Sequence, residues 1–153
     1  MLSPWLKIPH FLQTRDGRCL EACVRAVLAH WQYPVSEEQL CQLFESSQFG
    51  TPASRVLRLK QWGFEVIYGP SDVIKLQTWL AQGVPIIALV QTEFLDYATV
   101  NTPHAVVVIG LTDQQVYLQD PMFEQVPQIA SLNGFLAAWL EMDETIAIIM
   151  QRQ

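Results

Sequence analysis

Residues 13–30, QTRDGRCLEACVRAVLAH, decide the fold and contain the first candidate site residue. From Leu20 to His30, apolar residues recur at helical spacing, which predicts an amphipathic helix. The polar run before it, Thr14–Arg18, is typical of a flexible loop. Cys19 therefore lies in the first helical turn, where free backbone N–H groups and the helix dipole favour a thiolate over a thiol.

A thiolate is the attacking form of cysteine, so Cys19 is the candidate nucleophile. Arg15 and Arg18 add positive charge near it. The other two cysteines, Cys23 and Cys41, lie within amphipathic helical patterns and are interpreted as small core residues. Cys19 and Cys23 are one helical turn apart, which suits a disulfide poorly. An odd number of cysteines is typical of reduced thiols, and we expect a cytoplasmic protein.

The rest of the chain predicts an α+β fold with an N-terminal helical half packed on a C-terminal, mostly antiparallel sheet. Capping residues and terminal glycines indicate further helices at about 36–47, 51–62, 71–82 and 131–141. Ser36, with Gln39 three residues later, forms a capping-box pattern. Apolar and alternating runs indicate strands at 64–68, 84–91, 104–110, 115–119 and 145–150.

Length and composition indicate a single domain that spans residues 1–153. Half of the residues are hydrophobic and 16% are charged, which argues against disorder. The net charge of −6 and the lack of a basic run argue against nucleic acid or an anionic membrane surface as a partner. The N-terminus lacks the features of a signal peptide, and no apolar run approaches the roughly 20 residues that cross a bilayer.

His104 is the candidate base among the three histidines. It begins an apolar strand directly after the polar segment Thr92–Pro103, and a base at a strand end faces a cleft while the strand holds its backbone. His10 and His30 lie in loop-like surroundings without an evident partner and are interpreted as surface or packing residues.

Asp120 is the candidate partner of His104. If the strands 104–110 and 115–119 pair across their turn, residue 105 faces Asp120, and a shift of one residue sets His104 opposite Asp120. Opposed side chains have Cβ atoms about 4.5–5.5 Å apart, so an imidazole and a carboxylate can meet there. The carboxylate would orient the ring and favour its charged form.

Gln13 lies six positions before Cys19, and its amide together with the Cys19 backbone N–H could hold a developing oxyanion. The segment Thr92–Pro103 delivers His104 and is expected to border the cleft, with Phe94 and Tyr97 as candidates for lining a substrate pocket. No cysteine–histidine spacing resembles a zinc site, so no metal or other cofactor is expected.

Two blocks of the sequence resemble the papain-like cysteine peptidases of the bacteriocin-processing type, which cut leader peptides after a double glycine. The first block is Ile8–Gln13 (IPHFLQ), five intervening residues and Cys19–Cys23 (CLEAC). The second block comprises Gly83–Ala88 (GVPIIA), Pro103–Gly110 (PHAVVVIG) and Gln119–Pro121 (QDP). The matching residues follow one another in order over nearly the whole chain.

The resemblance implies a papain-like fold in which the helix of the nucleophile packs against an antiparallel sheet. It also implies that Cys19 is the nucleophile, His104 the base, Asp120 the orienting group and Gln13 the oxyanion-hole donor. The expected substrate is a peptide or protein.

The sequence departs from that family in two respects. Leu20 stands where the family usually has glycine, and a bulky residue there is expected to narrow the cleft and contact substrate. No transporter segment is attached, so the resemblance implies a standalone domain rather than a leader-cleaving exporter.

Three functions remain open from the sequence. The first is a cysteine peptidase that hydrolyses peptide or related amide bonds. The second is a catalytically degenerate domain of the same fold that binds peptides without cutting them. The third is a papain-like thiol acyltransferase, in which an amine or thiol takes the acyl group in place of water.

Overall fold

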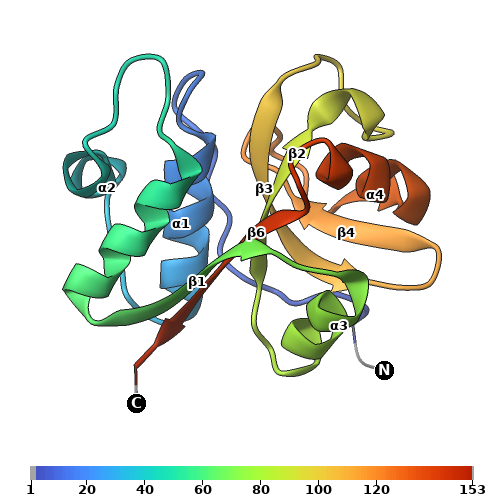
Figure 1. Ribbon diagram of the computed structural model, residues 1–153, viewed down its shortest axis with the longest axis horizontal. Coiled ribbons are helices and arrows are strands. Elements are labelled where there is room, and N and C mark those ends of the chain that lie inside the picture. The colour runs from blue at the N-terminus through green and yellow to red at the C-terminus, as the bar shows by residue number, and fades with distance from the viewer. Residues whose placement is uncertain (1–2, 153) are drawn as a thin grey trace.

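The computed structural model describes residues 3–152 and contains a six-stranded antiparallel sheet with helices on both faces (Figure 1). The strand order across the sheet is β1-β6-β2-β3-β4-β5. The strands are β1 (Phe64–Pro70), β2 (Ile86–Gln91), β3 (Pro103–Leu111), β4 (Gln115–Gln119), β5 (Gln128–Ser131) and β6 (Thr145–Gln151). The helices are α1 (Cys19–His30), α2 (Glu37–Phe44), α3 (Val73–Ala81) and α4 (Leu132–Leu140), with 3-10 helices η1 (Ala53–Trp62) and η2 (Thr92–Phe94).

The central strands are buried on both faces, which explains why they read as continuous apolar runs rather than alternating ones. Along β3, Ala105, Val107 and Ile109 pack in one core with α1, α2 and η1. The intervening Val106 and Val108 pack in a second core with α3 and α4. Figure 1 shows α1 and α2 on one side of the sheet and α3 and α4 on the other.

The α+β class expected from the sequence is confirmed, but the chain does not divide cleanly into a helical and a sheet half. Strand β1, from the first half, forms one edge of the sheet beside the C-terminal β6. Helix α3, also from the first half, packs with α4 in the second core.

Local signals fixed most element ends. Ser36 caps α2 with the complete capping box, although the helix ends at Phe44 because Glu45 turns left-handed. The segment expected as a third α-helix forms the 3-10 helix η1, which stops at Gly63 with a φ of 92°. The four-residue edge strand β5 was not predicted, because so short a run follows a proline and carries little pattern.

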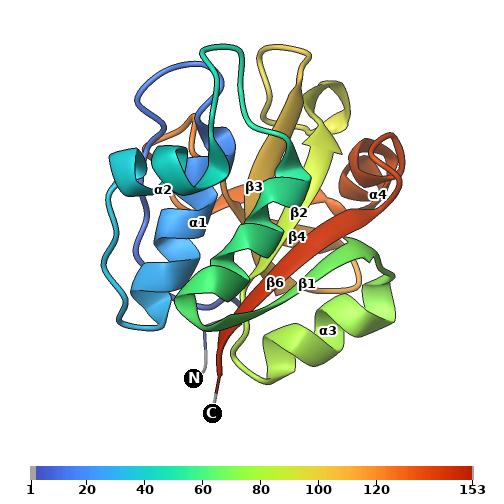
Figure 2. The same cartoon turned by 60° about the vertical axis from the view of Figure 1, so that its left-hand side comes forward.

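Three loops, 13–18, 45–52 and 92–103, gather at one end of the molecule (Figure 2). Helix α1 begins at this end with Cys19, and β3 begins there with Pro103. Across residues 3–152, no helix has the length and apolar character needed to cross a membrane.

Candidate active site

A cleft of about 800 Å³ lies where these loops meet. It brings the first turn of α1 into one site with the start of β3. The residues lining the cleft are Gln13, Asp16, Gly17, Cys19, Leu20, Ser47, Phe49, Gly50, Thr51, Pro52, Val100, Thr102, Pro103, His104 and Met122.

Cys19 is the first residue of α1, is partly exposed, and lines the cleft. Arg18, at the cap position, makes no side-chain bond to the helix end. The guanidinium of the buried Arg18 instead donates to the carbonyl oxygens of Gly17 and Ser47, at 2.8 Å each. Arg18 therefore ties the start of α1 to the loop 45–52 in the cleft wall.

His104 and Asp120 form a buried ion pair beside Cys19. The two side chains are 3% and 1% exposed, and His104 Nε2 donates to Asp120 Oδ1 at 2.7 Å. The same Oδ1 accepts from the Met122 backbone N–H at 2.9 Å, and Oδ2 accepts from the Tyr97 hydroxyl at 2.7 Å. Both carboxylate oxygens are thus satisfied, as a buried charge requires.

The expected contact of His104 with Asp120 forms, but not in the expected register. Val107 pairs with Gln119, so continuing that register sets Asp120 opposite Val106 rather than residue 105. His104 and Val106 share a face, and the ion pair is therefore a diagonal contact across the two strands. The turn is centred one residue later than expected, because Leu111 pairs with Val116, and the bulge between Val108 and Gly110 reverses half of the resulting two-residue shift.

The electrostatics of the pair favour opposite charges. Burial alone would lower the pKa of His104, but hydrogen bonds from its ring to Asp120 and Cys19, and their negative charges, raise the pKa to about 9. Burial alone would raise the pKa of Asp120, but its bonds with His104, Met122 and Tyr97 hold that pKa below the usual value. At neutral pH the ring is therefore charged, and the carboxylate is its counter-ion.

Gln13 and Leu20 lie at the cleft as expected. Gln13 Nε2 donates to the Arg15 carbonyl at 3.2 Å, and Oε1 is buried and has no hydrogen-bond partner within residues 3–152. The backbone N–H of Gln13 donates to the Pro121 carbonyl at 2.9 Å, which ties the Gln13 segment to the turn after Asp120. Leu20 is only 4% exposed, so little of its side chain is presented to a ligand.

Phe94 and Tyr97 do not line the cleft, in contrast to the sequence-based expectation. Tyr97 points its hydroxyl at Asp120 and packs its ring edge-on against Phe123, with centroids 5.4 Å apart. Phe94 ends the 3-10 turn η2, whose backbone packs against α4. The part of this segment that does reach the cleft is its later half, through Val100, Thr102 and Pro103.

The other two cysteines differ from Cys19. Burial strongly raises the pKa of Cys23, whose Sγ donates to the Ala105 carbonyl at 3.4 Å. Burial also raises the pKa of Cys41, which is partly exposed rather than a full core residue. All three cysteines are free thiols in the structure.

Glu21 is a site residue that the sequence analysis did not single out. It is fully buried two residues after Cys19, and its Oε2 accepts from the hydroxyls of Ser46 and Thr51 at 2.8 and 2.5 Å. These bonds hold the loop 45–52, which forms one wall of the cleft. An acidic residue inside the apolar run Leu20–Cys23 was the available signal.

The remaining two histidines form hydrogen bonds with backbone carbonyl groups. His10 Nε2 bonds with the Phe123 carbonyl at 2.7 Å, and His30 Nε2 bonds with the Gly83 carbonyl at 2.9 Å. They are packing residues as expected, although each has a partner that the sequence did not reveal. Among residues 3–152, no three His, Cys, Asp or Glu side chains group in a way that could hold a metal ion.

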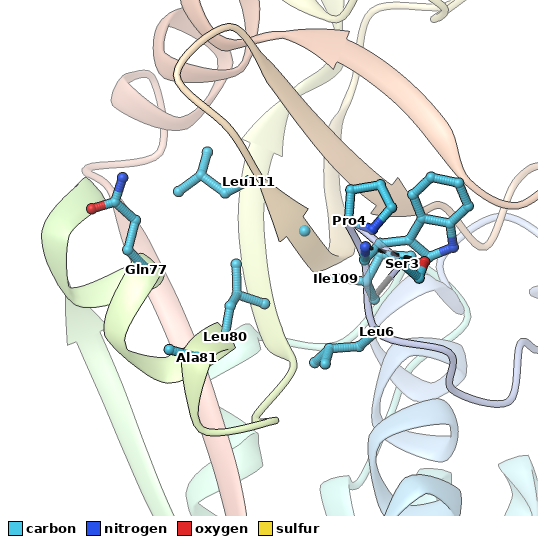
Figure 3. Close-up of a pocket in the computed structure, with 10 residues that line it drawn as sticks. Ser3, Pro4, Leu6, Gln77, Leu80, Ala81, Ile109 and Leu111 are labelled. Atoms are coloured by element: carbon cyan, nitrogen blue, oxygen red, sulfur yellow. Dashed lines mark hydrogen bonds between the residues drawn. The ribbon is translucent and has the colours of Figure 1, made fainter. Parts of the chain in front are cut away.

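A second pocket, of about 260 Å³, lies between the N-terminal segment and α3 (Figure 3). Ser3, Pro4 and Leu6 face Leu80 and Ala81 across it, near the end of β3. Among the described residues, its lining contains neither a thiol nor an ionisable side chain, in contrast to the cleft around Cys19.

Solved structures of peptidase domains share this fold. A C39-like peptidase from Bacillus anthracis aligns with a TM-score of 0.78 at 14% identity, covering 99% of this chain and 100% of that one. The peptidase domain of Streptococcus ComA, a bifunctional ABC transporter involved in quorum sensing, aligns with a TM-score of 0.75 at 20% identity, covering 98% and 100%. A double-glycine motif protease from an AMS/PCAT transporter, solved with its leader peptide, also gives 0.75 at 20% identity, covering 97% and 94%.

These similarities confirm the papain-like fold that the sequence resemblance implied. No curated protein sequence matches the chain. The family model described as "Peptidase_C39 like family" matches residues 5–147, and the chain therefore belongs to that family.

Proposed function

We propose that this protein is a cysteine peptidase in which Cys19 is the nucleophile, His104 the base and Asp120 the orienting group. The observation that carries the proposal is the buried His104–Asp120 pair, with His104 and Cys19 side by side in the lining of an open cleft. The proposal treats residues 1–153 as a single peptidase domain, and the free cysteines fit the cytoplasm as its location.

The first step is attack by the Cys19 thiolate on the carbonyl carbon of a peptide bond. With Nε2 of His104 bonded to Asp120, Nδ1 is left to receive the thiol proton. The pKa of about 9 keeps the resulting imidazolium charged at neutral pH, which stabilises the thiolate–imidazolium pair.

The tetrahedral intermediate needs donors for its oxyanion. The backbone N–H of Cys19 is one candidate, and the Gln13 amide, which uses one of its two N–H groups on Arg15, offers another. Loss of one such donor typically raises the barrier by about 2.7–4 kcal/mol. His104 then gives its proton to the leaving amine, and water, activated by the neutral ring, releases the acyl group from Cys19.

The proposed substrate is a peptide or a peptide segment of a protein. A related protease was solved in complex with a leader peptide, which supports a peptide as the ligand of the corresponding cleft here. The cleft of about 800 Å³ has room for several side chains of such a ligand.

Turnover of a peptide library tests this function. The wild type should cut a subset of peptides, and Cys19→Ala should abolish cleavage because the attacking sulfur is gone. Cys41→Ala is the matched control, since it removes a partly exposed thiol outside the cleft and should retain activity. Cleavage that survives in Cys19→Ala, or a wild type that cuts no peptide, would contradict the proposal. Added amines should not divert the products, as they would for an acyltransferase.

A further inference from the structure

We propose that Tyr97 is a positioning residue that sets how strongly Asp120 holds the proton of His104. Its effect on turnover rests on the proposed peptidase function, but its effect on His104 does not. The residue acts through Asp120 and does not line the cleft.

The bond pattern of the carboxylate carries this inference. Oδ1 of Asp120 takes two donors, the His104 ring and the Met122 backbone. The Tyr97 hydroxyl, 2.7 Å from Oδ2, is the only donor to that oxygen among residues 3–152. Because Asp120 is 1% exposed, water cannot readily replace it.

Tyr97 is fixed from two sides. Its ring packs edge-on against Phe123, whose backbone N–H donates to the Asp120 carbonyl at 3.0 Å. Its loop is cross-linked by Thr92, whose N–H donates to the Thr102 carbonyl at 3.1 Å and whose hydroxyl donates to the Val100 carbonyl at 2.6 Å. The segment that positions Tyr97 is therefore also the one that leads into β3 and His104.

The hydroxyl shares the charge of a carboxylate that has little other solvation. Burial raises the pKa of Tyr97, so the phenol stays a donor throughout the working pH range. Without the Tyr97 hydroxyl, more of the negative charge of Asp120 lies on Oδ1, and Oδ1 becomes a stronger acceptor for the His104 proton. The other titratable neighbours of this network, Cys19 and Cys23, come from α1 and would remain.

Titration of the His104 ring by NMR in the full-length protein tests the inference directly. In Tyr97→Phe, the midpoint should rise by about 0.5–1 pH unit, the size expected for one charge-assisted hydrogen bond. Turnover should fall about 3- to 10-fold in kcat with KM within twofold, since a proton held more tightly is a poorer acid for the leaving amine. The alkaline limb of the pH profile should move upward with the ring.

Tyr117→Phe is the matched control, because it also removes one tyrosine hydroxyl, bonded to Gln115 at 3.2 Å on β4 away from the cleft. It should change neither the midpoint nor kcat. An unchanged or lowered His104 midpoint in Tyr97→Phe would overturn the inference, whatever happens to turnover. A wild type without peptidase activity would remove the proposed function but leave the titration as a valid test of Tyr97.

Discussion

Two carboxyl groups are buried behind the residues that line the cleft, Glu21 in α1 against the loop 45–52 and Asp120 after β4 against His104. Both are almost completely buried, at 0% and 1% exposure, and both accept hydroxyl hydrogen bonds. They differ in their partners. Asp120 is bonded to an ionisable ring and has both oxygens paired. Glu21 is bonded to neutral hydroxyls, and in the described part of the chain its Oε1 has no partner.

The difference shows that burial alone does not identify a catalytic carboxylate. The charge of Asp120 reaches His104 and changes its proton affinity, so it can act on the chemistry. The carboxyl group of Glu21 is hydrogen-bonded to Ser46 and Thr51, so it acts on the shape of the loop 45–52. What a buried charge is bonded to decides which of the two it does.

The largest difference between the two carboxyl groups is expected in kcat. Asp120→Asn should lower kcat about 10²- to 10⁴-fold, because His104 loses its counter-ion and its fixed orientation. Glu21→Gln should change kcat less than about threefold, since it keeps the shape of a group that does not contact His104. Steady-state kinetics on one cleaved peptide gives both values. Similar losses in the two variants would remove the distinction between the carboxylates.

The free energy of unfolding should show the pH dependence of the His104–Asp120 pair. His104 has its pKa raised from 6.5 to about 9, so its contribution is complete below about pH 6.5 and is lost as pH rises through 9. Asp120 has its pKa lowered from 3.8, so its contribution is present above that value and is lost as pH falls. The pair therefore stabilises the fold most between about pH 4 and 6.5.

Urea unfolding across this range measures the effect. The wild type should lose about 3 kcal/mol of unfolding free energy between pH 6.5 and 9 from this pair. His104→Gln should lack that slope, and Glu21→Gln should keep it. A slope that persists in His104→Gln would assign it to other groups.

Removing the Glu21 side chain should lower the free energy of unfolding. Glu21→Ala leaves the hydroxyls of Ser46 and Thr51 to bond only with each other and opens a small cavity. We expect a loss of about 2 kcal/mol in unfolding free energy, within the range for a buried hydrogen-bonded group. Urea unfolding at pH 6 gives the value, and a loss below about 0.5 kcal/mol would mean that Glu21 does not brace the loop.

The smallest effect is expected from removing one of the two hydroxyls that donate to Glu21. Thr51→Val removes a donor to Glu21 and keeps the side-chain shape, so the cleft wall should loosen slightly. We expect KM to rise about two- to fivefold with kcat unchanged, because uniform binding is lost while the chemistry is not. A fall in kcat with constant KM would instead connect this loop to the reaction.

The sequence predicted what local signals and the family resemblance carry. Helix α1, the Ser36 cap and the approach of His104 to Asp120 were expected and are found. The predicted strand register was wrong because the turn is centred one residue later than expected, and the bulge beside Gly110, where the N-terminal segment crosses β3, then shifts the pairing back by one residue. A Cβ on Gly110 would be 2.5 Å from the Pro4 carbonyl, a contact between residues far apart in sequence.

The hydrogen-bond partners of Tyr97 and Glu21 could not be predicted from the sequence, because they too lie far away along the chain. Tyr97 was expected at the substrate pocket because its loop leads to the cleft, but the loop turns its ring toward Asp120, 23 residues later. Glu21 accepts a hydrogen bond from Thr51, which lies 30 residues later, in the loop between α2 and η1. Both contacts depend on tertiary packing, which cannot be predicted from the spacing of residues in the sequence.

The most direct test of the account is the alkylation rate of each cysteine by iodoacetamide at pH 7, followed by peptide mapping. Cys19 should be labelled at least about tenfold faster than Cys23 and Cys41, whose pKa values are raised by burial. In His104→Gln, the rate at Cys19 should fall toward that of Cys41. Equal labelling of Cys19 and Cys41 in the wild type, or a Cys19 rate that does not respond to the loss of His104, would contradict the claim that His104 and Asp120 activate this thiol.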